Sequence, residues 1–390
     1  MPQDIISTVT LGIQTAGSMR YTYLLFCLSL IALSCSRNDK AVWMTCPQTD
    51  SDITIEKIDI QKTILDSVYT SYSGYSGLFG DKLYFYDKFF AYLYQFDIDG
   101  KLAGKKLGLG RGPGEIPIKN ALLCAIADNG DICVSGAALD FAKYSSSSQK
   151  TEYIRLSYEA DMNTVNPDNF MNYSLNAYNC QALLKGDELY VNVFIEHPHY
   201  NPFNGADGFI ENACRIGVIN LKNKTTRMTV KGFPAIYHKD SKKYNTFDMV
   251  NFTGDKSGLL VNFEADSTIY RCNIEGYPKQ AFGRSGRGMD NDYKPIYGIT
   301  DESVANYPVN RSEKGSYGKL AAHGDFVLRS YTRGISTQSD GLQIYDKDIL
   351  VADLDVPKGF KPAGIIGNKV ISEIIADDES GVLYFYSFEL

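Results

Sequence analysis

Leu93-Tyr94-Gln95-Phe96-Asp97 shows a pattern that returns five times further along the chain: an apolar residue, two variable residues, an apolar or aromatic residue, and then a turn-forming residue. The other copies are Phe141-Ala142-Lys143-Tyr144-Ser145, Ile216-Gly217-Val218-Ile219-Asn220, Ile269-Tyr270-Arg271-Cys272-Asn273, Leu342-Gln343-Ile344-Tyr345-Asp346 and Leu383-Tyr384-Phe385-Tyr386-Ser387. They begin at positions 93, 141, 216, 269, 342 and 383, which are 48, 75, 53, 73 and 41 residues apart. Six copies with inserts of variable length indicate six repeats of one structural unit.

A tight turn and a second apolar run precede each copy. Glycine supplies the positive φ that hairpin turns need, and Asn or Asp can bond to its own backbone there. The six turns are Gly80-Asp81-Lys82, Asn129-Gly130-Asp131, Gly186-Asp187-Glu188, Lys256-Ser257-Gly258, His323-Gly324-Asp325 and Gly367-Asn368-Lys369. A further short run before each turn, and an outer strand after each of the first five copies, give these units four antiparallel strands.

Six such units without helical periodicity predict an all-β fold, a six-bladed β-propeller that spans residues 52–390 as one domain. The 28 Tyr, 20 Phe and 34 Gly of the chain suit many short strands joined by tight turns. The sixth unit ends at Leu390 with its third strand, and a separate N-terminal strand at about 53–60 precedes the first unit. Placed as the outer strand of the last blade, this strand closes the ring and removes an open sheet edge.

Connection lengths differ between the two faces of the predicted disc. When strands a to d of a blade run outward, the a–b and c–d turns lie on one face, and the b–c loops and blade-to-blade connections lie on the other. The a–b and c–d turns are all short. The long connections all belong to the second class: His197 to Ala213, Thr332 to Asp340, Gly108 to Asn120, Ser157 to Ala177, Gly232 to Thr246 and Gly283 to Ser316. We expect this long-loop face to carry the binding function.

The N-terminus predicts export. Met19-Arg20 opens a basic region, and Tyr21 to Leu33 is an apolar run of signal-peptide length that ends two residues before Cys35. We interpret residues 1–35 as a leader and lipoprotein-type signal peptide, with Met19 as the expected start, and residues 36–51 as a linker. Cys35 is then lipidated and anchors the chain to a membrane of the bacterial cell envelope, on its periplasmic or surface side. The alternative is plain secretion, with Cys35 incidental.

The loop after the first blade reads Gly110-Arg111-Gly112-Pro113-Gly114-Glu115, and the strand and turn before it read Tyr94-Gln95-Phe96-Asp97-Ile98-Asp99-Gly100-Lys101. Together with the lipoprotein-like signal, this stretch resembles the TolB-like six-bladed β-propeller lipoproteins of the Bacteroidetes. The close match covers residues 92–117, and the rest of the mature chain is similar in architecture. The resemblance implies the propeller fold and a location in the cell envelope, but no reaction and no functional residue.

This glycine-rich loop and a related one, Gly283-Arg284-Ser285-Gly286-Arg287-Gly288, supply the candidate binding residues Arg111, Glu115, Arg284 and Arg287. Neither loop has the Gly-Lys-Ser/Thr of a phosphate-binding loop. We expect the four side chains to line the mouth of the central channel, where guanidinium groups can bind carboxylates or sugar hydroxyls. The alternative is that the glycines let the chain pass tightly from blade to blade while Arg and Glu pair locally.

A second candidate site contains His197 and His199, the only paired histidines among the four in the chain. Two histidines at this spacing can share a divalent cation with a carboxylate such as Glu196 or Asp207. The alternative is an ordinary surface loop. We predict no cofactor other than this cation. The six cysteines after Cys35 form no CxxC pair, and buried thiols are the expected state of those in apolar strands.

Charge and motifs limit the classes of function. The net charge is −7 with no basic block, so no nucleic-acid partner is expected. The sequence has no nucleophile elbow, no HExxH motif and no Ser/His/Asp grouping. We therefore predict a non-enzymatic binding or scaffold module of the cell envelope, which engages a protein or a glycan through the long-loop face. The alternative is an envelope hydrolase or lyase, metal-assisted or not, with its site at the channel mouth.

Overall fold

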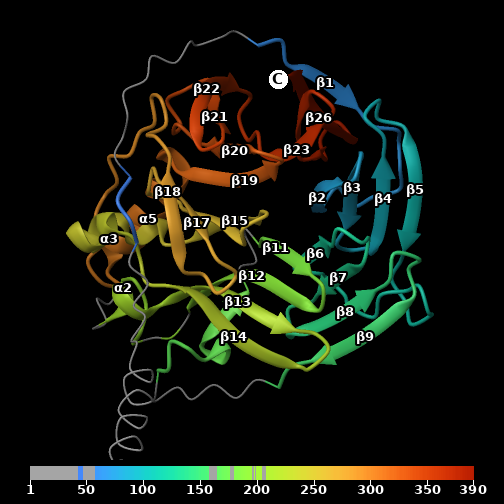
Figure 1. Cartoon of the computed structure of the whole chain (residues 1–390), viewed down its shortest axis with the longest axis horizontal. Helices are drawn as coiled ribbons and strands as arrows, with labels where there is room; N and C mark the ends of the chain where they lie inside the picture. Colours follow the sequence, from blue (N-terminus) through green and yellow to red (C-terminus); the bar gives the residue numbers. More distant parts are fainter. Residues whose placement is uncertain are drawn as a thin grey trace, which may run out of the picture. The chain divides into compact units, whose positions relative to one another are not determined.

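The structure is a computed structural model that describes residues 43–46, 58–157, 165–175, 180–195, 197, 199–203 and 208–390. Within these residues the strands form six antiparallel sheets that stand around a central axis as the blades of a propeller (Figure 1). Each repeat of the sequence becomes one blade, and each of the six pattern copies becomes the third strand of its blade. The predicted six-bladed β-propeller is confirmed. The leader, the signal peptide and Cys35 lie outside the described residues.

Blades one, two, four and five are four-stranded sheets in which each strand pairs with its neighbours in the chain. Blade one contains β2 (Gly74–Phe79), β3 (Lys82–Asp87), β4 (Tyr92–Phe96) and β5 (Leu102–Leu107), and blade two contains β6 (Leu123–Ile126), β7 (Ile132–Ser135), β8 (Asp140–Tyr144) and β9 (Lys150–Arg155). Blade four contains β15 (Val250–Gly254), β16 (Leu259–Phe263), β17 (Ile269–Cys272) and β18 (Pro278–Phe282). Blade five contains β19 (Tyr317–His323), β20 (Phe326–Tyr331), β21 (Asp340–Asp346) and β22 (Ile349–Val356).

Blades three and six have five described strands each. In blade three, two short strands share the innermost position beside the second strand. These are β10 (Tyr173–Leu175) and β11 (Ala182–Lys185), and they are followed by β12 (Glu188–Ile195), β13 (Cys214–Asn220) and β14 (Thr225–Lys231). Blade six contains β23 (Pro362–Ile366), β24 (Lys369–Ser372), β25 (Ile375–Asp377), β26 (Val382–Glu389) and, from the N-terminal side of the chain, β1 (Gln61–Ile64).

The strand β1 closes the ring by pairing antiparallel with β26, as its outer neighbour (Figure 1). Ring closure is as predicted, but the bounds are wrong: the strand begins at Gln61 rather than within 53–60. Residues 58–60 belong to no strand, and the remainder of that range lies outside the described residues. Pairing with β26 selects the register, and it sets the Lys62 ammonium 3.7 Å from the centroid of the Tyr384 ring. The alternation of apolar and polar residues along the N-terminal segment does not predict which residues pair with β26, so the sequence alone did not fix the bounds of this strand.

The hydrophobic core lies between neighbouring blades. Large side chains on facing sheets pack together, and Phe85 of blade one shares a buried cluster with Phe385 of blade six. Six a–b turns join the first and second strands of the blades. Each contains a glycine with positive φ, as predicted: Gly80, Gly130, Gly186, Gly258, Gly324 and Gly367.

Trp43 falls within the predicted linker, yet it is buried in the largest apolar cluster. Its ring makes edge-to-face contacts with Phe263, at 5.0 Å between centroids, and with Tyr270, at 4.7 Å. The indole N–H donates to the carbonyl of Lys231 at 3.2 Å. This segment is therefore tied to blades three and four of the propeller.

The helices of the described residues all lie in b–c loops or blade-to-blade connections, so the long-loop face is the elaborated one. They are η1 (Phe170–Asn172), α2 (Phe209–Asn212), α3 (Ala235–Lys239), α4 (Ser241–Tyr244), η2 (Asn245–Phe247) and α5 (Asp301–Glu313). None of these helices is long and apolar enough to cross a membrane. The thirteen-residue α5 corrects the prediction of a plain loop after blade four. Thr300 caps its N-terminus, because the Thr300 hydroxyl accepts from the Ser303 N–H at 3.2 Å.

Candidate functional site

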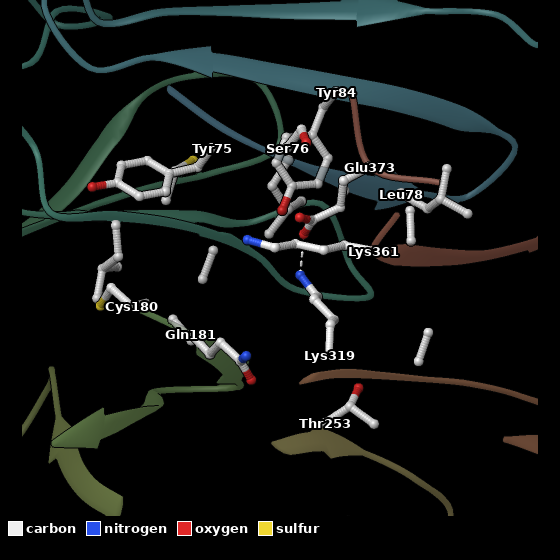
Figure 2. A pocket seen from close by; sticks show the side chains of 18 of the residues that line it. Tyr75, Ser76, Leu78, Tyr84, Cys180, Gln181, Thr253, Lys319, Lys361 and Glu373 are labelled. Atoms are coloured by element: carbon white, nitrogen blue, oxygen red, sulfur yellow. Dashed lines mark hydrogen bonds and ion pairs between the residues drawn. The ribbon is translucent and has the colours of Figure 1, made fainter. Parts of the chain in front are cut away.

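A central cavity of about 480 Å³ lies between the innermost strands of the six blades. Its walls come from β2, β6, β11, β15, β19 and β23 and are mostly small or apolar. Three charged side chains line it, namely Lys319, Lys361 and Glu373. Figure 2 shows them extending towards one another into the cavity from blades five and six. Each stands where its strand meets the long-loop face: near the start of β19, before β23, and after β24.

The cavity has an excess of positive charge. Lys319 and Glu373 form an ion pair across the boundary between blades five and six. Lys361 has no ion-pair partner among the described residues, and its backbone carbonyl accepts a hydrogen bond from the Glu373 N–H at 2.7 Å. One cation is thus left uncompensated in the lining. In a concave site, such a charge acts more strongly on a counter-ion than it would on an open surface.

Tyr84 reaches the cavity from β3, the second strand of blade one, because Gly77 in front of it has no side chain. A Cβ at Gly77 would lie 2.8 Å from the Tyr84 hydroxyl oxygen and 3.0 Å from ring atoms. Burial, followed by the influence of Cys124 and Glu373, raises the pKa of the Tyr84 hydroxyl far above its usual value. The hydroxyl therefore stays protonated. It has no hydrogen-bond partner among the described residues, so it can donate into the cavity.

Buried amide side chains hold the cavity wall between blades three, four and five. The Gln181 backbone N–H donates to Asn192 Oδ1 at 2.8 Å, and Gln181 Oε1 accepts from the Phe252 N–H at 2.9 Å. The Gln181 side chain also donates to Asn251 Oδ1. Asn251 in turn donates to the Tyr317 carbonyl at 3.2 Å. Because these groups are buried and mutually bonded, the wall is held in one arrangement.

Polar side chains attach α5 to the long-loop face of blade four. Arg311 donates to both carboxylate oxygens of Glu264, at 2.6 and 3.1 Å. Asn310 is fully buried and donates to the Thr246 hydroxyl at 3.0 Å and to the Lys294 carbonyl at 2.8 Å. This side of the helix, which faces the protein, is therefore polar.

Apolar side chains stand on the solvent-exposed side of α5, next to the exposed Asp301 and Glu302. Val304 is 66% exposed, and Ile299, just before the helix, is 70% exposed. The rings of Phe203 and Tyr307 meet edge to face at 5.8 Å between centroids. These residues border a hollow of about 360 Å³, here called the α5 groove, which is lined by Phe203, Ile296, Gly298, Ile299, Ser303, Val304 and Tyr307.

The structure places the first glycine-rich loop against the outer strands of blade two, and none of its residues lines the cavity. Glu115 Oε2 accepts from the Gly112 N–H at 2.8 Å, and the Glu115 carbonyl accepts from the Tyr144 hydroxyl at 2.7 Å. The N–H of Lys150 in β9 donates to the same loop at 3.1 Å. Arg111 is exposed. Glu115 is thus bonded locally at a blade crossing, but Arg111 and Glu115 do not form the local pair that the alternative expected.

The second glycine-rich loop packs on blade five in the same way. The Arg284 N–H donates at 3.2 Å to the hydroxyl of Tyr345, which occupies the repeat position of Tyr144. Arg287 forms an ion pair with Asp355 in β22. The two loops thus serve different blade boundaries, one–two and four–five, and the four predicted residues do not come together in one site. A binding role for any of them stays a prediction.

The histidine pair lies in the b–c connection of blade three. His197 is buried and His199 is exposed, with 6.0 Å between their ring centroids. His197 Nδ1 accepts from the His199 N–H at 3.2 Å, so one ring nitrogen is used within the loop. Glu196 and Asp207, the expected carboxylate partners, lie outside the described residues. In the part of the chain that is described, no three His, Cys, Asp or Glu side chains stand close enough together to hold a metal ion.

The cavity residues Lys319, Lys361 and Glu373, and the α5 groove, were missed by sequence reasoning. The sequence does contain a signal for the cavity residues. The innermost strands consist mostly of small and apolar residues, so a charged residue such as Lys319 in one of these strands is unusual. The groove has no comparable signal, because its exposed apolar residues look like core residues in the sequence.

Comparisons with known proteins add little. No family model and no curated protein matches the chain. Among solved structures, the chain is similar to a protein of Bacteroides fragilis described as exported, with a TM-score of 0.48 and 14% identity over 85% of this chain and 96% of that chain. It is also similar to BamB of Moraxella catarrhalis, with a TM-score of 0.36 and 10% identity over 84% of this chain and 100% of that chain. Membership of the TolB-like group stays a prediction.

Proposed function

We propose that this chain is a non-enzymatic binding module of the cell envelope that engages a protein partner through the α5 groove on its long-loop face. One observation supports this most directly: α5 buries Asn310, pairs the half-buried Arg311 with Glu264 of blade four, and exposes Val304. A helix that serves only to cover a core has the opposite arrangement, with its apolar side inward. An exposed apolar hollow bordered by polar residues is typical of a protein interaction site.

The chemistry of the groove suits a protein better than a glycan. Among the described residues that line the groove, Ser303 is the only one with a hydrogen-bonding side chain apart from Tyr307. Sugar hydroxyls need several donors and acceptors, whereas an apolar side chain needs none. Full burial of a Val or Ile side chain contributes about 1.5–3 kcal/mol. Asp301 and Glu302 are exposed in the first turn of α5, which favours a partner with a basic residue beside its apolar anchor.

The test begins with a photo-crosslinking amino acid at position 304 in the intact chain, expressed in cells. The matched control carries it at position 349, because Ile349 is 67% exposed and follows a c–d turn on the opposite face. We expect a defined protein adduct from position 304 alone. The purified adduct partner should then bind Val304→Asp at least tenfold more weakly than wild type, and Ile349→Asp equally well. Equal adducts from both positions, or unchanged binding by Val304→Asp, would contradict the proposal.

The envelope location is proposed from the signal at residues 19–35. If Cys35 is the lipid anchor, Cys35→Ser should lose incorporation of labelled palmitate and move to the soluble fraction. A chain that keeps the label and stays with the membrane after this change is anchored elsewhere.

The alternative of a hydrolase or lyase at the channel mouth has no observation in its favour. Paired carboxylates would be the simplest machinery for such chemistry. Glu373 is the one carboxylate among the described residues that line the cavity, and it is bound to Lys319. The carboxylates that line the adjoining cleft, Glu264 and Asp340, are bound to Arg311 and Lys358. This alternative stays a prediction.

A further inference from the structure

We propose that the central cavity is a second, separate binding site, which takes a small organic anion with one carboxylate and several hydroxyl groups. The site is independent of the α5 groove: it shares no lining residue with that groove. It also needs no partner protein, so either proposal can fail without the other.

Charge is the first argument. The lining contains two ammonium groups, on Lys319 and Lys361, and a single carboxylate, on Glu373. Because Glu373 pairs with Lys319, Lys361 is the cation that an incoming anion would meet. Figure 2 shows the Lys361 side chain crossing the cavity beside this ion pair. The net charge of the lining is one positive unit, which matches a monoanion rather than a phosphate dianion or a neutral sugar.

The hydrogen-bonding groups around this charge are the second argument. The Tyr84 hydroxyl can donate a hydrogen bond to a ligand in the cavity, and the hydroxyl of Thr253 lines the same cavity. The Gln181 side chain also lines it, and the bonds to Asn251 and Phe252 fix its orientation. Polar groups held on a rigid scaffold recognise ligand hydroxyls at a small entropic cost. An anion with hydroxyl groups can therefore use both the charge and these partners.

Size and access agree with a small ligand. The cavity volume of about 480 Å³ falls in the range of roughly 300–1,000 Å³ that is usual for small-molecule sites. Lys361 is exposed and stands where the chain enters β23 from the long-loop face. The lining continues there into a smaller cleft of about 230 Å³ that shares Lys319 and Lys361. An anion can thus reach the charged end of the cavity without opening the ring.

The experiment is isothermal titration calorimetry of the purified full chain at low ionic strength. The probe is D-glucuronate, and D-glucuronamide is the matched ligand, because it has the same shape without the charge. We expect glucuronate to bind and the amide to bind at least tenfold more weakly. The affinity for glucuronate should also fall as salt is added. No heat of binding with up to about 10 mM glucuronate, or equal binding of the amide, would overturn the proposal.

Two variants shift the charge of the lining in opposite directions. Lys361→Met removes the uncompensated cation and should weaken glucuronate binding at least tenfold. Glu373→Gln removes the competing carboxylate, frees Lys319 for the ligand and should tighten binding at least threefold. A gain in affinity cannot result from misfolding, so the pair remains informative even if one variant is less stable. Lys279→Met, on an exposed outer strand, is the matched control and should bind like wild type. Unchanged affinity in both cavity variants would refute the assignment.

Discussion

Arg329 tests how blades four and five are joined. Its side chain, in β20, is fully buried. The guanidinium donates to the Ser267 carbonyl at 2.8 Å, to the Arg284 carbonyl at 2.7 Å, and to the Tyr345 hydroxyl at 3.1 Å. It also lies 4.2 Å from the centroid of the Tyr317 ring. One side chain thus links the b–c loop of blade four, the glycine-rich connection and the core of blade five.

The cost of removing this group can be worked from its contacts. In Arg329→Met most of the volume remains, but four hydrogen bonds are lost, to the three acceptors above and to Gln343 Oε1, at about 1 kcal/mol each, and about 2 kcal/mol of cation–π attraction is also lost. Against this, the variant no longer buries a guanidinium, which recovers about 3 kcal/mol or more. The balance is a loss of about 3 kcal/mol in the free energy of unfolding.

Urea unfolding followed by tyrosine and tryptophan fluorescence measures this difference. Arg155→Met, which removes an exposed arginine from the outer strand of blade two, should change the free energy of unfolding by less than about 0.5 kcal/mol. If Arg329→Met is as stable as the wild type, the desolvation of the buried cation equals everything its contacts contribute, and the reasoning is refuted.

Three further predictions concern other parts of the ring. Asp87 is buried, and although burial raises the pKa of its carboxyl, hydrogen bonds from the N–H groups of Phe90 and Ser71 outweigh that effect and leave the pKa below its usual value. The contribution of the Asp87 carboxylate to stability is therefore complete above about pH 4 and is lost as the pH falls through the folded-state pKa. We expect Asp87→Asn to be about 2 kcal/mol less stable than the wild type at pH 7 and closer to it at pH 3. Urea titrations at the two pH values measure this difference. Trp43→Ala should lower the free energy of unfolding by about 3 kcal/mol. If the segment around Trp43 were a free linker, the substitution would leave the free energy of unfolding unchanged, and urea titration distinguishes these outcomes. Burial raises the pKa of the Cys133, Cys214 and Cys272 thiols to about 12. Alkylation of these thiols by iodoacetamide at pH 8, mapped by peptide mass spectrometry, should therefore be at least tenfold slower in the native chain than in urea. Equal rates would contradict their burial.

The repeat architecture could be predicted because its signals are local. A third strand such as Leu93–Phe96 is recognised by its spacing of apolar residues, and a turn such as the one at Gly80 by a glycine that takes positive φ. The ring-closing strand was predicted in kind but not in position. Both 53–60 and the residues of β1 are compatible with an outer strand, and only pairing with β26 decides between them.

The helix α5 was not predicted, because the residues that hold it are polar and lie far away in the sequence. Arg311 binds Glu264, 47 residues earlier, and Asn310 binds Thr246, 64 residues earlier. In isolation the same residues read as solvent-exposed polar positions of a loop. Their burial depends on how blade four presents its connections.

The candidate sites follow the same division. Residue order alone determined that the chain forms six blades, where the tight turns within each blade lie, and that one face carries the long connections, because these properties depend on residues close together in the chain. Only the tertiary structure decided which side chains meet. Lys319 and Glu373 are 54 residues apart, yet they pair because the ring brings the inner strands of blades five and six to one axis. The glycine-rich loops, conspicuous in the sequence, lie at the one–two and four–five blade boundaries, because each follows the outermost strand of its blade.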